Sequence, residues 1–136
     1  MASIHHETFI AVDPGTVWDA ARAVGHLHDR LVPGFVTATE MLGGDGPPVR
    51  RVTFANGNIL DETIVAVDDA RRRLVWAIKA VEHHNGVLTV AEAPGGACVS
   101  WTADVLPDAL ADQFGSAMAQ GLALMKAHLE RAARTS

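Results

Sequence analysis

Tyrosine is absent from the 136-residue chain, cysteine occurs once, and lysine occurs only as Lys79 and Lys126. The lack of tyrosine excludes mechanisms that need a tyrosine acid, and the lone Cys98 excludes an intrachain disulfide. A Schiff-base mechanism would have two candidate lysines. No apolar run approaches the ~20 residues of a membrane-spanning helix, and no signal peptide is recognisable. We therefore expect a cytoplasmic protein with no membrane span.

Positive charge is also scarce, since the formal net charge is −5 at pH 7. Proteins that bind nucleic acid cluster lysine and arginine against the phosphates, so nucleic acid is not an expected partner. The basic run 71–73 follows two aspartates and indicates a solvated turn. An apolar fraction of 49% and a charged fraction of 20% are typical of a globular protein. The length predicts a single domain over residues 1–136.

Motifs that identify an enzyme class are missing. The sequence holds no nucleophile elbow, phosphate-binding loop, dinucleotide fingerprint or zinc-protease motif. His26 and His28, with Asp29 beside them, come nearest to a metal cluster. Zinc sites need further Cys, His or carboxylate ligands at tight spacing, so an exposed segment is the better interpretation. We expect no metal and no cofactor.

Strand-like runs and tight turns fill most of the chain. Asp13-Pro14 predicts a helix start, with Asp as N-cap and Pro at the first helical position, and a second short helix is expected near Val24–Leu31. Asn56-Gly57 predicts a two-residue hairpin, and His84-Asn85-Gly86 predicts another turn. The strands are expected at Ser3–Val12, Phe35–Leu42, Val49–Phe54, Ile59–Val67, Leu74–Val81, Val87–Ala93 and Ala97–Leu106. This order favours an antiparallel meander.

One long amphipathic helix is predicted from Asp108 to Arg134. Its apolar stripe has the spacing of a helix laid on a core and comprises Leu110, Phe114, Met118, Gly121, Leu122, Met125 and Leu129. The fold class is therefore α+β, with the helices on one face of a sheet. A glycine inside a helix costs ~1 kcal/mol relative to alanine. Gly121 thus indicates either room for a ligand or close packing against Trp76 or Phe54.

Several segments together resemble the SRPBCC superfamily, also called START or Bet v 1-like, and within it the bacterial polyketide cyclase/dehydrase subgroup. The resemblance covers nearly the whole chain. It is carried by residues 11–19, 49–51, 56–57, 61–64, 68–69, 99–101 and 121–126. It implies a helix-grip fold, in which a seven-stranded antiparallel sheet wraps around the C-terminal helix and two short helices lie between strands 1 and 2. It also implies a hydrophobic cavity between sheet and helix.

Strand alternation, with the inward face chosen by the resemblance, predicts the cavity wall. The expected ligand-binding residues are Val52, Phe54, Leu60, Ile64, Trp76, Ile78, Leu88, Val90, Ser100, Phe114, Met118, Gly121, Leu122 and Met125. The hormone-receptor relatives place a glutamate inside the pocket at the position of Glu62. A two-residue turn would set Glu62 opposite Arg51, one step from Arg50, so either arginine could pair with it.

His83 and His84 lie at an expected hairpin tip similar to the loop that latches the cavity mouth in the hormone receptors. Adjacent strand residues point to opposite faces, so only one of them could reach the pocket. The candidate catalytic set is Glu62 as base, Arg50 or Arg51 as oxyanion or carbonyl holder, and His83 or His84 as acid.

Three functions remain open from the sequence. The first is binding of a small hydrophobic ligand of lipid-, polyketide- or hormone-like type in the internal cavity. The second is a cyclase, aromatase or dehydratase that uses Glu62 with an arginine or a loop histidine. The third is an interaction domain. A small hydrophobic molecule is the expected partner, and a homodimer is an open alternative to a monomer.

Overall fold

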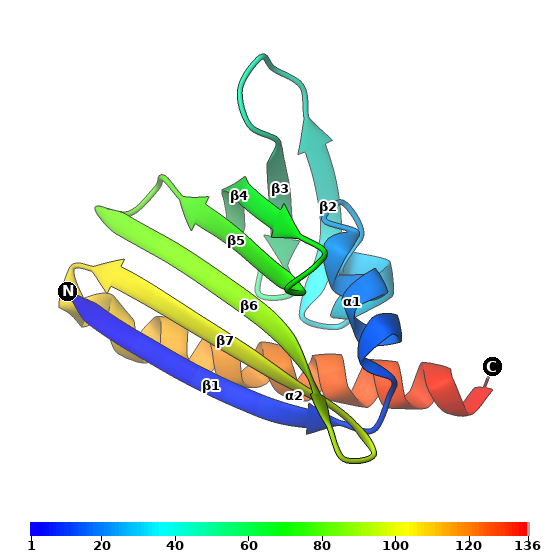
Figure 1. The fold of residues 1–136 in the computed structure, drawn as a ribbon. Coiled ribbons are helices and arrows are strands. Elements are labelled where there is room, and N and C mark those ends of the chain that lie inside the picture. Colours follow the sequence, from blue (N-terminus) through cyan, green and yellow to red (C-terminus); the bar gives the residue numbers. More distant parts are fainter. Residues whose placement is uncertain (136) are drawn as a thin grey trace.

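A computed structural model describes residues 1–135 as one seven-stranded antiparallel sheet and a long C-terminal helix. The strand order is β1-β7-β6-β5-β4-β3-β2 (Figure 1). The strands are β1 (Ala2–Ile10), β2 (Val36–Leu42), β3 (Val49–Phe54), β4 (Ile59–Asp68), β5 (Arg73–Ile78), β6 (His83–Ala93) and β7 (Gly96–Leu106). The helices are α1 (Pro14–Arg22), the π-helical turn η1 (Leu27–Leu31), the 3₁₀ turn η2 (Asp108–Leu110) and α2 (Ala111–Thr135). The predicted α+β helix-grip architecture is confirmed.

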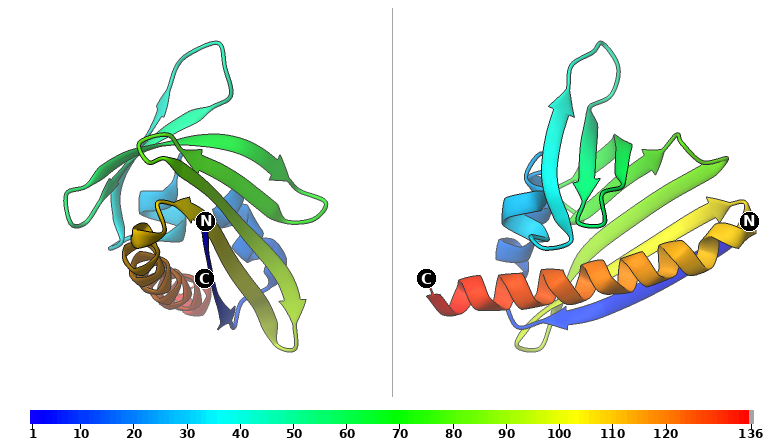
Figure 2. Two further views of the ribbon diagram at one scale, coloured as in Figure 1. Left: turned by 90° about the vertical axis from the view of Figure 1, so that its left-hand side faces the viewer. Right: turned by 180° about the vertical axis from the view of Figure 1, so that it is seen from behind.

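The sheet curls over α2 instead of lying flat on it. Figure 2 shows β1 and β7 running along α2, whereas the β2–β3 hairpin rises away from the helix. The helices α1 and η1 lie at one end, between the start of β2 and α2. None of the helices in residues 1–135 combines the length and the apolar character that a membrane crossing requires.

Helix α1 begins where the sequence predicts. The Asp13 carboxylate accepts hydrogen bonds from the Gly15 and Thr16 backbone amides at 2.9 and 3.3 Å, and Pro14 occupies the first helical position. The helix is then fastened to the β4–β5 turn, because the Trp18 indole N–H donates to Asp69 at 2.9 Å. These local bonds hold the segment that leads into η1.

The apolar stripe of α2 faces the sheet, as predicted. Met118, Gly121, Leu122, Met125 and Leu129 are buried. Burying a large apolar side chain of this kind contributes about 1.5–3 kcal/mol relative to exposure, so the stripe holds the helix in place. At its far end, Lys126 donates to the Phe9 carbonyl at 2.6 Å and so ties α2 to the edge strand β1.

The β3–β4 hairpin differs from its prediction by one residue. The Phe54 amide donates to the Asn58 carbonyl at 2.8 Å, so the loop contains three residues instead of the two of a tight Asn-Gly turn. Gly57 has a φ of +91°, the left-handed conformation that closes such a three-residue loop. The shift places Arg50 opposite Glu62 and Arg51 opposite Asp61.

The predicted turn at His84-Asn85-Gly86 is wrong. These residues belong to β6, and His84 pairs with Val105 on β7. Strand β5 ends at Ile78, and the turn lies before His83. A Cβ on Gly86 would come within 2.8 Å of the Trp76 ring, so this glycine makes room for the indole on the inner face and does not mark a turn.

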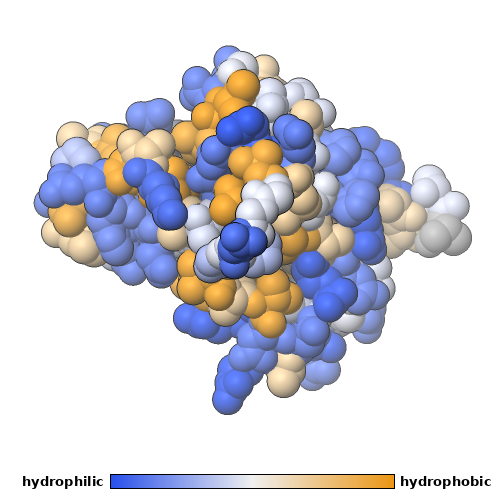
Figure 3. Space-filling view, turned by 90° about the horizontal axis from the view of Figure 1, so that it is seen from above, coloured by the Kyte–Doolittle hydropathy of each residue, from blue (hydrophilic) through white to orange (hydrophobic). Residues whose placement is uncertain are grey.

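The outer face of the sheet is not uniformly polar. Ile59, Val65 and Val67 on β4 are 59%, 57% and 39% exposed. Seen from above, the surface shows hydrophobic groups gathered near the centre and bordered by hydrophilic ones (Figure 3). Exposed apolar groups are normal on a protein surface and do not by themselves identify an interface. The homodimer therefore stays a prediction.

Candidate ligand-binding cavity

A cavity of about 360 Å³ lies inside the fold. Its walls come from the inner face of the sheet, from α2 and from the segment that contains η1. Eight of the residues expected to bind ligand line it, namely Phe54, Leu60, Trp76, Ile78, Leu88, Phe114, Met118 and Met125. Arg50, Glu62 and His84 line it as well. The volume falls within the usual range of small-molecule sites, whose walls are mostly apolar with few polar groups.

Four other expected residues lie in the packed core beside the cavity. Val52, Ile64, Val90 and Leu122 are 0–5% exposed and belong to the main hydrophobic cluster. They do not line the cavity. Their inward orientation was correctly predicted, on the strands for the first three and on α2 for Leu122, but they are buried in the core.

Ser100 was assigned to the wrong face of β7. Its hydroxyl donates to Glu7 at 3.4 Å on the outer side, whereas Trp101 lines the cavity. The inward residues of β7 are Ala97, Val99, Trp101, Ala103 and Val105. They form an unbroken apolar alternation from 97 to 105, and this signal in the sequence would have identified Trp101.

Gly121 does not leave a gap for a ligand. A Cβ at this position would lie 3.1 Å from both the Phe35 and the Trp101 rings. The glycine instead lets the two aromatic rings pack against α2. Of the two interpretations offered by the sequence, close packing therefore holds, but its partners are Phe35 and Trp101 and not the expected Trp76 or Phe54.

Arg50 and Glu62 form a buried ion pair in the cavity wall. Arg50 Nε donates to Glu62 Oε1 at 2.8 Å, and the side chains are 3% and 8% exposed. The Arg50 guanidinium also lies 5.6 Å from the centre of the Trp76 ring. Charges this deep are expensive unless they compensate each other, so the pair holds both groups in place. Arg51, the other candidate partner, points outward to Asp61.

His84 is the polar residue that the shifted β6 brings into the cavity. It is 5% exposed, and its ring lies 5.3 Å from that of Phe114. Burial, together with the neighbouring His83, lowers the pKa of His84 to about 4. The imidazole is thus neutral near pH 7. His83 does not line the cavity, as expected for a neighbour on the opposite face.

Two nitrogens in this wall have no hydrogen-bond partner. Among the described residues, His84 Nδ1 and Trp101 Nε1 are the buried side-chain nitrogen or oxygen atoms left unpaired. An unpaired buried polar atom costs about 1–3 kcal/mol. Both belong to residues that line the cavity, so two nitrogen atoms of its wall are free to form hydrogen bonds.

The segment from Val24 to Val36 closes one side of the cavity. Leu27, Leu31, Val32, Phe35 and Val36 line it, although none of them was among the residues expected to bind ligand. Because η1 is a π-helical turn, its apolar residues do not follow the usual 3.6-residue spacing. Periodicity therefore could not assign this segment to the wall.

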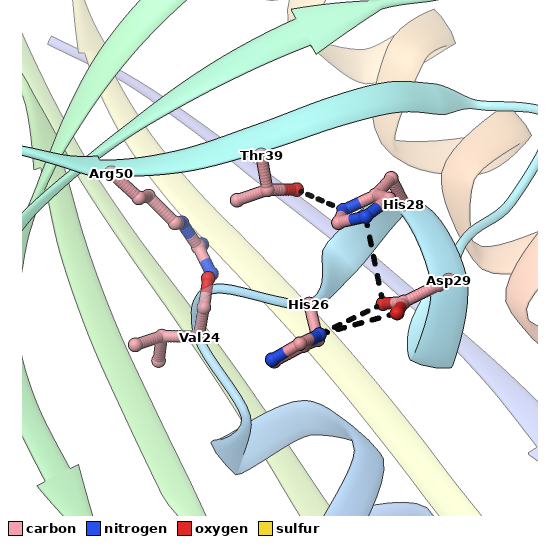
Figure 4. Close-up of polar contacts among 6 residues, drawn as sticks. All are labelled: Val24, His26, His28, Asp29, Thr39 and Arg50. Carbon is pink, nitrogen blue, oxygen red and sulfur yellow. Dashed lines mark hydrogen bonds and ion pairs between the residues drawn. The ribbon is translucent and has the colours of Figure 1, made fainter.

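Polar bonds hold this closing segment to the sheet (Figure 4). Arg50 Nη1 donates to the Val24 carbonyl at 3.3 Å, which links the buried ion pair to the start of the segment. His28 Nδ1 lies 3.1 Å from the Thr39 hydroxyl on β2. Within the segment itself, His26 Nδ1 lies 3.2 Å from each Asp29 carboxylate oxygen. Within residues 1–135, no group of three or more His, Cys, Asp or Glu side chains could hold a metal ion.

Solved structures show the same fold. Protein XoxI from Bacillus cereus is 19% identical, with 94% of this chain and 95% of that one covered at a TM-score of 0.81. Ara h 8.0201 is 20% identical, with 93% and 96% covered at 0.70. Norcoclaurine synthase from Thalictrum flavum, solved as a point mutant with a transition state analogue, is 24% identical, with 96% and 95% covered at 0.63. Identities this low establish the fold alone.

Sequence comparison identifies the family. No curated protein sequence matches the chain. A family profile described as polyketide cyclase / dehydrase and lipid transport matches residues 1–135. The predicted SRPBCC-type resemblance is confirmed: the chain belongs to the polyketide cyclase/dehydrase and lipid transport family.

Proposed function

We propose that the protein binds a small hydrophobic molecule in the cavity between the sheet and α2, and that it releases the molecule unchanged. The single observation that carries this proposal is the cavity of about 360 Å³ with its predominantly apolar wall. Filling such a space with an apolar ligand removes hydrophobic surface from water on both partners. The family description, which includes lipid transport, supports the same class of function.

The arrangement of the polar groups favours binding over turnover. A carboxylate acts as a base by taking a proton from a substrate, but one oxygen of Glu62 already accepts a hydrogen bond from Arg50 at 2.8 Å. His84, with its pKa of about 4, carries little of the protonated form that an acid requires near neutral pH. His83 and Arg51 lie outside the cavity.

Native mass spectrometry of protein purified from its own cells tests the proposal. We expect a population heavier than the bare chain by the mass of one small molecule, which organic solvent extracts and which rebinds to the stripped protein. If the protein carries no such molecule and binds none of the apolar compounds extracted from the same cells, ligand binding is wrong.

An enzyme of the cyclase, aromatase or dehydratase type is the second candidate. One observation favours it, namely that Arg50, Glu62 and His84 all line the same cavity. The test is Glu62→Gln, assayed with the compound recovered by mass spectrometry. Lost turnover with unchanged affinity would support catalysis, whereas lost affinity without any turnover in the unaltered protein would support binding.

Two expectations about the protein's setting also remain proposals. A cytoplasmic location is tested by fractionating the source cells and probing each fraction with an antibody. A homodimer is tested by analytical ultracentrifugation over a range of concentrations, in which a constant monomer mass would contradict it.

A further inference from the structure

Few of the residues that line the cavity can carry charge. Of those that the structure describes, only Arg50, Glu62 and His84 are ionisable. Arg50 and Glu62 neutralise each other at 2.8 Å, and the buried His84 ring is held in its neutral form. No charged side chain in the wall is left to pair with a ligand.

The mouth of the cavity is polar but uncharged. Five lining residues are exposed, carry a neutral amide or hydroxyl group, and come from the β3–β4 loop and from α2, namely Asn56, Asn58, Gln113, Ser116 and Gln120. The three on α2 are spaced 3 and 4 residues apart, so they form one stripe on the helix. Because they are both exposed and part of the wall, they mark where the cavity meets solvent.

We propose that the ligand is an uncharged molecule whose apolar body fills the interior and whose hydroxyl or carbonyl oxygen binds the neutral amides at the mouth. This inference rests on the proposed binding function. A carboxylate or ammonium group drawn into the cavity would lose its hydration without gaining a counter-ion, which is expensive. Ligands that would bring a carboxylate or ammonium group into the cavity are therefore disfavoured relative to alcohols, phenols, ketones and lactones.

A matched probe series tests the charge preference. Naphthalene, 2-naphthol, 2-naphthoate and 2-naphthylmethylamine share one apolar body, and at neutral pH the last two are ionised. We expect calorimetry to show 2-naphthol binding at least about tenfold more tightly than either ionised probe, and about threefold more tightly than naphthalene. Equal or tighter binding of 2-naphthoate would overturn the inference while leaving hydrophobic binding intact. Failure of all four probes would overturn both proposals.

A charge placed at the mouth sharpens the test. Gln120→Arg adds a guanidinium where the cavity opens, and its exposed position should allow the variant to fold. Ala119→Arg is the matched control, since it adds the same charge to an exposed neighbour outside the wall. We expect Gln120→Arg to raise the affinity for 2-naphthoate about tenfold and Ala119→Arg to leave it nearly unchanged. An equal rise in both variants would contradict the placement of the polar end at this mouth.

Discussion

The β3–β4 hairpin carries two arginine–carboxylate pairs side by side, one facing the cavity and one facing water. Arg50–Glu62 and Arg51–Asp61 occupy adjacent register positions, with Nε–O distances of 2.8 and 2.9 Å. Their exposures differ widely, at 3% and 8% for the inner side chains against 45% and 46% for the outer ones. The Nε–O distances are nearly the same, but Arg51 also donates from Nη2 to the second Asp61 oxygen at 3.1 Å, whereas Arg50 donates from Nη1 to the Val24 carbonyl.

This difference shows what determines the role of a charged pair. Water screens and solvates the outer groups, although the hydrogen bonds from Arg51 still hold the pKa of Asp61 below its usual range. The inner groups depend on each other, and Arg50 also holds the Val24 carbonyl of the closing segment. The inner pair therefore forms part of the cavity wall, whereas the outer pair lies on the solvent-exposed surface.

Removing one arginine from each pair gives the largest expected effect. Arg50→Met leaves Glu62 buried without a partner and should lower the free energy of unfolding by about 3–5 kcal/mol. Arg51→Met is the matched control, and its carboxylate partner stays in water, so we expect little change. Urea denaturation monitored by tryptophan fluorescence measures both. Similar losses in the two variants would contradict the account of the inner pair.

Replacing both inner charges sharpens the comparison further. Arg50→Met combined with Glu62→Leu removes the charges together, so no buried ion remains uncompensated. We expect the double variant to recover about 2 kcal/mol or more of the stability that Arg50→Met loses, because apolar pairs often replace buried ion pairs without loss. A double variant as unstable as the sum of its single variants would show that packing, and not charge compensation, sets the cost.

The adjacent histidines extend the comparison to pH. The His84 ring lines the cavity 5.3 Å from that of Phe114, and burial together with the charge of His83 outweighs the opposing effect of Asp104 and lowers the His84 pKa from 6.5 to about 4. In the unfolded chain His84 has its ordinary pKa of 6.5, so below that pH the unfolded state binds a proton that the folded state does not. The free energy of unfolding that is present above pH 6.5 therefore falls by about 2–3 kcal/mol as the pH drops toward 4. His84→Leu should lose this component, whereas His83→Leu should retain it. Urea unfolding at pH 7, 5.5 and 4.5 measures the free energy of unfolding of the unaltered protein and of both variants. The same dependence of this free energy on pH in all three proteins would contradict the prediction.

Two glycines of α2 give the smallest effect. A Cβ on Gly115 would meet Ile4 at an ordinary 3.5 Å, whereas one on Gly121 would lie 3.1 Å from two aromatic rings. Gly115→Ala should therefore gain up to about 1 kcal/mol from helix propensity, and Gly121→Ala should gain less or lose stability. Thermal unfolding by calorimetry compares them. A larger gain at Gly121 would mean that space is free beside Phe35 and Trp101.

Much of the fold could be predicted because its signals are local. The N-cap at Asp13, the apolar stripe of α2 and the strand alternation each depend on a few neighbouring residues, and all three are present in the structure. The charge pair was predicted only as a choice between Arg50 and Arg51. The register depends on one extra residue in the loop, which the Asn56-Gly57 signal does not reveal.

The cavity was harder to predict because its details depend on contacts distant in sequence. Gly86 resembles a turn residue until the Trp76 ring is seen against it, and Gly121 resembles a gap until Phe35 and Trp101 fill the space. The wall formed by Leu27 and Leu31 has no regular period. Of the residues that were missed, Trp101 could have been found from the sequence, because the apolar residues of β7 alternate at the odd positions from 97 to 105 and Trp101 is one of them.

Filling the cavity tests the central claim most directly. Ala117 lies on α2 in the cavity wall, and Ala119 lies on the same helix outside it. Calorimetric titration with 2-naphthol should show at least tenfold weaker binding to Ala117→Phe than to Ala119→Phe, with circular dichroism confirming that both variants fold. Equal affinity in the two folded variants would contradict the claim that the ligand occupies the space between the sheet and α2.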